Sequence, residues 1–177
     1  MKKIVGLILL GLMVGQAATL KDFSGYWMVD MAKTKETMTA EEKAEISKMP
    51  EVMRKMAEAI VIQIEDKSMS AFIMSKVEKQ ECNEYKIQGN ELKTSCKLKG
   101  STKFKELNLK LDDKWLLVSQ PNTGKGGMDN FAFVRVSDTK AQTIIKSQPT
   151  QKDLQKMMMK MMLQNSAGES GGLKISP

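Results

Sequence analysis

Residues 81–98 read ECNEYKIQGNELKTSCKL, and this stretch predicts a β-hairpin. Segments with alternating apolar and polar residues lie on both sides of a turn centred on Gly89. Cys82 and Cys96 are the two cysteines of the chain, and they lie equally far from Gly89. They face each other in such a hairpin, so we expect a Cys82–Cys96 disulfide across it.

The alternation continues on both sides of this hairpin and predicts a chain built mainly of β-strands. Each segment is long enough to stand in a sheet. The predicted strands are GYWMVD at 25–30, followed by 60–65, 69–77, 84–88, 91–98, 104–111, 115–120 and 130–137.

The connections between these strands differ in length. Tight turns are expected at 66–68, 88–90 and 112–114, and longer connections at 35–59, 79–83, 99–103 and 121–129. Every second connection of an up-and-down meander lies at the same end, so the tight turns gather at one end. Closing the eight strands removes both unpaired edges. We therefore expect an eight-stranded antiparallel up-and-down barrel with an open mouth at the long-loop end.

The longest connection, 35–59, is predicted to be a helical insertion after the first strand. Thr39 and Glu42 have the spacing of a capping box, and Pro50 suits the first turn of a second helix. A further amphipathic helix is expected at 150–165, where Thr150 and Asp153 have the spacing of a helix cap.

The pair Gly25-x-Trp27 at the start of the first strand resembles the lipocalin signature. Arg135 in the last strand matches the arginine that lipocalins pack against this tryptophan at the closed end of the barrel. The helical insertion is similar to the lid of the intracellular fatty-acid-binding proteins, which belong to the same calycin class. The resemblance implies structural roles for all three residues, with Gly25 permitting a close backbone approach, and a small hydrophobic ligand or lipid inside a lipocalin-like barrel.

The inward-facing apolar residues are the candidate ligand contacts. They are Ile62, Ile64, Ile73, Tyr85, Ile87, Leu92, Leu107, Leu109, Leu117, Phe131 and Phe133. The sequence does not decide which face of the last strand points inward. Phe131, Phe133 and Arg135 lie on one face, and three apolar residues lie on the other. The same lining also suits a solid core, so a packed barrel with a structural or interaction role is the alternative.

The first residues, 1–17, have the pattern of a secretory signal peptide, with two lysines followed by an apolar run that is too short to span a membrane. We therefore expect a periplasmic or secreted bacterial protein with a barrel domain at 18–149. The segment 166–177 has the composition of a disordered tail. The charge of +7 comes from scattered lysines, which does not favour nucleic-acid binding.

Methionine is enriched, with 16 residues, and KMMMKMML at 156–163 is the densest cluster. Met157, Met158, Met161 and Met162 offer thioethers that suit Cu(I), which makes a copper site one alternative. The same residues form an apolar helical stripe that can pack on the barrel, a membrane surface or a partner.

Nothing in the sequence favours an enzyme. The chain has no histidine, which excludes the commonest general base. The segment NTGKGG at 122–127 lacks the remaining residues of a phosphate-binding loop and is interpreted as a turn. We therefore expect a binding protein without a cofactor.

Overall fold

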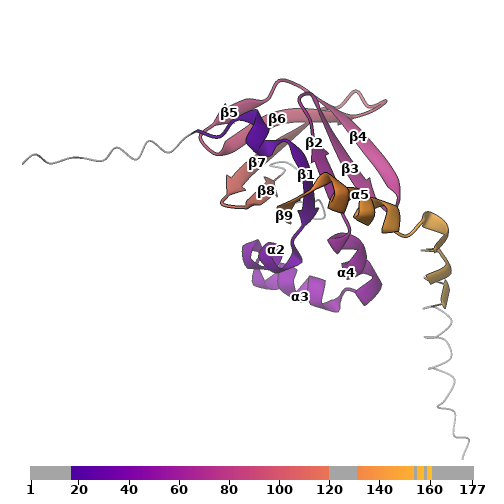
Figure 1. Ribbon diagram of the computed structural model, residues 1–177. Helices are drawn as coiled ribbons and strands as arrows, with labels where there is room; N and C mark the ends of the chain where they lie inside the picture. Colours follow the sequence, from indigo (N-terminus) through magenta and orange to yellow (C-terminus); the bar gives the residue numbers. More distant parts are fainter. Residues whose placement is uncertain (1–16, 120–130, 154, 158, 161–177) are drawn as a thin grey trace, which may run out of the picture.

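The structure is a computed structural model that describes residues 17–119 and 131–160, except 154 and 158. In this part of the chain, one antiparallel sheet has the strand order β4-β3-β2-β1-β9-β8-β7-β6-β5, and β4 also pairs with β6. That last pairing closes the sheet into a barrel (Figure 1). The strands are β1 (Gly25–Val29), β2 (Val61–Ile64), β3 (Ser68–Ile73), β4 (Lys76–Cys82), β5 (Lys86–Gln88), β6 (Glu91–Leu98), β7 (Lys105–Asp112), β8 (Trp115–Ser119) and β9 (Phe131–Val136).

β5 continues the line of β4 along β6, so the two count as one interrupted strand of an eight-stranded barrel. Cys82 pairs with Cys96 at the end of β4, and Lys86 pairs with Lys93 in β5. Four steps along β4–β5 therefore match three steps along β6, which is the geometry of a β-bulge. The predicted eight-stranded antiparallel barrel and the predicted disulfide are both confirmed.

The predicted strand 69–77 and the predicted loop 79–83 are wrong. Residues 68–82 form the hairpin β3–β4, with a two-residue turn at Met74 and Ser75. Both turn residues have positive φ, 54° and 57°, as a tight hairpin turn of this kind requires. The turn has no glycine or asparagine to mark it in the sequence, and it places a short connection at the open end of the barrel.

Tertiary contacts hold this turn in place. The Ser75 backbone N–H donates to Gln148 Oε1 at 3.0 Å, and the Ser75 hydroxyl donates to the Gln148 carbonyl at 2.8 Å. The Gln148 amide in turn donates to the carbonyls of Ala59 and Phe72. Gln148 is only 5% exposed, and its side chain links the hairpin, the helical insertion and the end of the last long helix.

The helices lie at the ends and on one outer face of the barrel (Figure 1). They are α1 (Leu20–Phe23), α2 (Met31–Thr37), α3 (Ala40–Lys48), α4 (Glu51–Glu58) and α5 (Asp138–Ser147). The helical insertion after β1 is confirmed, although it starts at Met31 and not at residue 35. Thr39 and Glu42 form the predicted capping box. Pro50 is the N-cap of α4 instead of a residue in its first turn.

α5 was not predicted, because its polar residues hide a narrow apolar stripe. Ala141, Ile144 and Ile145 of this helix pack with Val61 and Val136 on the outer side of the sheet. After α5, the described residues between 151 and 160 are helical, and Thr150 and Asp153 make the predicted capping contacts. The rest of the helix predicted at 150–165 lies outside the described residues.

Within the described ranges, every helix is too short or too polar to cross a membrane.

The disulfide is predicted to stabilise the closure of the barrel. β4 and β6 share three residue pairs, and the Cys82–Cys96 pair is one of them. Replacing both cysteines by alanine is expected to lower the free energy of unfolding by about 3 kcal/mol, because the crosslink no longer restricts the unfolded chain. Chemical denaturation of the oxidised wild type and the double variant measures the loss.

Hydrogen exchange locates the effect. Amides of 80–82 and 96–98 are expected to exchange faster in the double variant, whereas the β1–β2 pair serves as the internal control. If the amides of 80–82 and 96–98 exchange at the same rate in the double variant as in the wild type, the disulfide has no role in closing the barrel.

Candidate functional site

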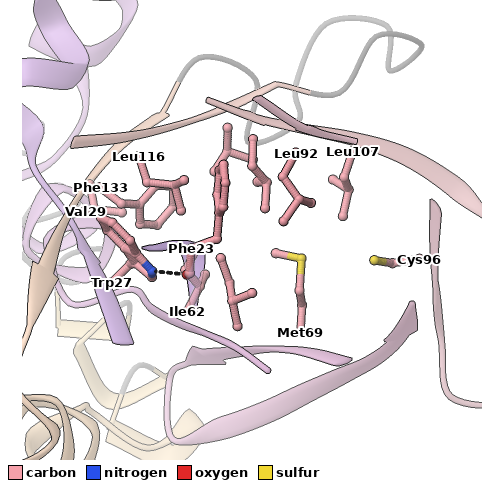
Figure 2. Packing of buried hydrophobic residues seen from close by; sticks show 13 residues of the cluster. Phe23, Trp27, Val29, Ile62, Met69, Leu92, Cys96, Leu107, Leu116 and Phe133 are labelled. Carbon is pink, nitrogen blue, oxygen red and sulfur yellow. Dashed lines mark hydrogen bonds between the residues drawn. The ribbon is translucent and has the colours of Figure 1, made fainter. Parts of the chain in front are cut away.

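The interior of the barrel holds one continuous apolar cluster (Figure 2). Its buried members are Phe23, Trp27, Val29, Ile62, Ile64, Met69, Leu92, Cys96, Leu107, Leu109, Leu116, Val118 and Phe133. Half-buried residues that pack against it include Ala71, Tyr85, Ile87 and Phe131. The cluster fills the barrel from the α1 end towards the end that carries the helical insertion.

Most of the candidate ligand contacts lie in this cluster. Ile62, Ile64, Leu92, Leu107, Leu109 and Phe133 are buried in it, and Tyr85, Ile87 and Phe131 pack against it. In β9, Phe131 and Phe133 therefore face inward, which settles the orientation of that strand.

Two candidates lie elsewhere. Leu117 is half-buried, and its neighbours Leu116 and Val118 belong to the core, so Leu117 faces outward. The prediction for Leu117 was wrong because all four residues from Trp115 to Val118 are apolar, and alternation cannot choose between the faces. Ile73 is half-buried beside the β3–β4 turn, outside the core cluster.

Sequence reasoning also missed inward residues. Val29 and Val118 each end a run of four consecutive apolar residues, 26–29 and 115–118, so alternation does not mark the inner face there. Met69 lies between Ser68 and Ser70, and this alternation was a signal that could have found it. Phe23 precedes the first strand and belongs to the four-residue α1. The one available signal for Phe23 was the FSGYW stretch, in which it lies four positions before Trp27.

Trp27 and Phe23 close one end of the barrel. The indole N–H of Trp27 donates to the Phe23 carbonyl at 2.7 Å, and both side chains are almost fully buried. The Arg135 guanidinium lies 4.7 Å from the Trp27 ring centroid and donates to the Asp22 carbonyl. The predicted contact between Trp27 and Arg135 is thus present, and it joins β1, β9 and α1 at the closed end.

Gly25 has a different role from the one expected. Its φ of 111° lies in a region that side chains rarely adopt, and nothing lies within 4 Å of the position that a Cβ would take. The glycine is required by backbone conformation and not by a close approach.

At the other end, α2 is anchored over β8 and β9. The Thr34 hydroxyl accepts from the Ala132 N–H at 3.0 Å. The Trp115 indole donates to Asp30 at 3.0 Å, and Lys33 and Lys114 lie within 4.6 Å of the Trp115 ring centroid. The hydrogen bonds that Asp30 accepts from the Lys33 backbone and from Trp115 lower its pKa. These contacts hold the insertion beside the mouth of the barrel.

A cavity of about 40 Å³ lies within the barrel interior. Its lining is mostly apolar and consists of Ile62, Met69, Ser70, Ala71, Gln80, Leu107, Val118 and Phe133. Met69 and Leu107 point into the interior from opposite walls (Figure 2). Pockets for drug-sized ligands measure roughly 300–1,000 Å³, whereas this cavity has room for only a few atoms, about the space of a few water molecules.

A larger groove of about 340 Å³ lies beside the bulge between β4 and β5. Its lining is polar, with Asn83, Glu84, Lys86, Lys93, Thr94, Ser95, Glu106 and Asn108. The groove therefore differs in chemistry from the barrel interior and does not suit an apolar ligand.

Potential metal ligands are dispersed over the described part of the chain. There, no group of three or more cysteine, aspartate or glutamate side chains gathers in one place. Met157 is half-buried. Met158, Met161 and Met162, the other members of the proposed Cu(I) cluster, lie outside the residues whose side chains are described.

Comparison of the chain with protein-family models, with curated proteins and with solved structures finds no match. The class of protein is therefore defined by its fold alone, as a closed eight-stranded antiparallel barrel with a helical insertion after the first strand.

Tyr85 provides a test of the geometry at the interior wall. Its hydroxyl donates to the Ser68 carbonyl at 3.3 Å, and burial, together with Asp66 and Glu65, raises its pKa to about 12. Between these two pH values the folded protein keeps the Tyr85 hydroxyl protonated, whereas the unfolded chain, with the ordinary tyrosine pKa of about 10, loses this proton. The free energy of unfolding is therefore expected to fall as the pH rises from about 10 to about 12.

Denaturant unfolding across that alkaline range measures the effect, with Tyr85→Phe as the control. The variant cannot ionise at this position, so its stability should decline less steeply than that of the wild type. Parallel declines would show that Tyr85 titrates normally.

Proposed function

We propose that the chain is an exported, calycin-type carrier that holds a small apolar molecule in its barrel. The observation that carries this proposal is the apolar cavity inside a barrel closed by Phe23 and Trp27. The contact between Trp27 and Arg135 supports the lipocalin-like assignment, since this is the pairing that the resemblance implies.

The cavity limits the kind of ligand. At about 40 Å³ it accepts a slender group, and a longer chain requires side chains of the lining to move. Met69 suits such movement, because methionine is unbranched and repacks easily. Ser70 and Gln80 add polar atoms to the lining that can orient one polar group of the ligand. A short acyl chain or a small apolar metabolite fits this description.

Export is part of the proposal. The disulfide supports an oxidising compartment, and the N-terminal residues 1–17 have the pattern of a signal peptide. We place the protein in the bacterial periplasm or outside the cell, and we assign it no catalytic role and no nucleic-acid partner.

The small volume of the cavity favours a second candidate function. In this alternative the barrel is a packed scaffold, and its outer surface or loops bind a partner. The two functions differ in what the interior contains when the protein is purified from its own compartment.

The first experiment examines the purified protein for a bound molecule. The exported protein is isolated without detergent, and its mass is measured under native and denaturing conditions, with solvent extraction of the same sample. A carrier is expected to show an added apolar mass that is lost on denaturation. A protein that never carries such a mass, even after incubation with short-chain fatty acids and other small apolar compounds, would favour the packed scaffold.

A second experiment fills the cavity. Ala71 lies in the lining, so Ala71→Val is expected to weaken binding of the apolar ligand and to raise the stability of the empty protein by about 1 kcal/mol. Binding and thermal unfolding are measured for both proteins. Ala44→Val on the exposed face of α3 is the matched control and should leave binding unchanged. Unaltered binding in Ala71→Val would place the ligand elsewhere.

A further inference from the structure

The positive charge of the described chain is unevenly distributed. One excess lies on β4 and on the end of β6 with its connection to β7, residues 76–81 and 97–106, which we call the basic rim. It carries six lysines and three glutamates: Lys76, Lys79, Lys97, Lys99, Lys103 and Lys105 against Glu78, Glu81 and Glu106. A second excess lies at 138–160, with five lysines against two aspartates.

The remaining described residues carry nearly equal numbers of basic and acidic side chains. The helical insertion with Asp30, residues 30–60, has six basic and seven acidic side chains. The rest of the barrel and its closed end have seven of each. The net positive charge therefore belongs to two regions and is not a general property of the surface.

These two regions also carry most of the exposed apolar side chains. Val77 is 59% exposed, and Leu98 and Phe104 are each 46% exposed. Met159, in the helical residues after α5, is 66% exposed. Among the described residues the other large apolar side chain of comparable exposure is Met53 in α4. Apolar side chains that coincide with a local excess of lysine indicate a binding surface.

The strand pairing explains why β4 and β6 do not cover each other along the rim. β4 and β6 pair at three positions, from Gln80 with Leu98 to Cys82 with Cys96. Beyond Gln80 the residues from Lys76 to Lys79 pair with β3 alone, and the chain after Leu98 turns through a Ser101 N–H to Leu98 carbonyl bond. Lys97 lies 5.2 Å from the Phe104 ring centroid, so lysine and apolar side chains are interleaved in the rim.

The second basic region adjoins the rim. The β3–β4 turn that precedes Lys76 is bonded through Ser75 to Gln148, directly after α5. Figure 1 shows this turn, the end of α5 and the helical residues that follow on the same side of the barrel. Lys152, Lys156 and Lys160 have the i, i+4 spacing of one helical face.

We propose that the basic rim, assisted by the described helical residues between 151 and 160, docks on an anionic phospholipid surface. Lysine near such a surface gains about 1 kcal/mol of attraction each, and valine, leucine and phenylalanine insert into the headgroup boundary. A nucleic acid is less well matched, because the rim contains no arginine and a single aromatic residue. The docking surface does not depend on whether the barrel contains a ligand.

Vesicle binding tests the proposal. The oxidised, full mature protein is mixed with phosphatidylcholine vesicles that contain or lack phosphatidylglycerol, and the bound fraction is measured by sedimentation. Binding is expected with phosphatidylglycerol and not without it, and added salt should weaken it.

Three variants locate the surface. Lys76, Lys99 and Lys103 are each replaced by glutamine in the rim variant, which should bind about a hundredfold more weakly, at about fivefold per lysine. The matched control changes Lys86, Lys93 and Lys110, which are also exposed and lie on β5, β6 and β7, and should bind nearly as the wild type does. Val77→Ser with Phe104→Ser keeps every charge and should also weaken binding. Thermal unfolding checks that each variant is folded.

The contrary results are distinct. Absence of binding to the phosphatidylglycerol vesicles overturns the proposal, as does an equal loss in the rim variant and its matched control. Unchanged vesicle binding in the Val77 and Phe104 variant overturns the insertion of these apolar side chains and shows that the lysines alone attract the vesicle.

Discussion

Closure of the sheet between β4 and β6 is the constraint on which the rest of the structure depends. An open sheet of this size exposes two rows of unpaired backbone groups, and the β4–β6 pairs remove both edges over the length that they cover. The contact is short, and the disulfide lies within it. The covalent bond strengthens a strand pairing that contains few backbone hydrogen bonds. It lies on the inner wall of the barrel, where Cys96 is 1% exposed.

The two ends of the barrel are completed in different ways. At the closed end, Trp27 connects α1, β1 and β9 through one indole hydrogen bond and one contact with a guanidinium. At the open end, separate segments are held by polar side chains that reach across the fold. Gln148 binds the β3–β4 hairpin and the end of the insertion, and Asp30 and Thr34 fasten α2. A buried glutamine is stable there because the described contacts use both its amide donor and its acceptor.

The interior and the rim suit different partners. The interior is apolar and its cavity measures about 40 Å³, which favours a small ligand or none. The rim is lysine-rich and exposes apolar side chains, which favours an extended anionic surface. The two properties are compatible in one protein, since a carrier of an apolar molecule gains from docking where such molecules are found. The lysines and the exposed apolar side chains of the rim do not line the cavity, so each property can be altered by mutation without the other.

The sequence by itself determined the class of fold, the disulfide and the tryptophan contact. Period-two alternation reports which side of a strand is buried, and the equal distance of Cys82 and Cys96 from Gly89 predicted their pairing. The hairpin turns at Gly89 and Asn90, with Gln88 paired to Glu91, and the bulge between Cys82 and Lys86 restores the predicted pair. The tertiary structure alone decided the Met74–Ser75 turn, the position of α5 and the inward side of β8. Met74 and Ser75 adopt a strained conformation that neither residue favours locally, and the contacts from Gln148, more than seventy residues away, hold it. In β8 the four consecutive apolar residues carry no alternation, so packing against β7 and β9 chose Leu116 and Val118 for the core. The volume left inside the barrel likewise depends on how side chains from all its walls interlock, which no local pattern records.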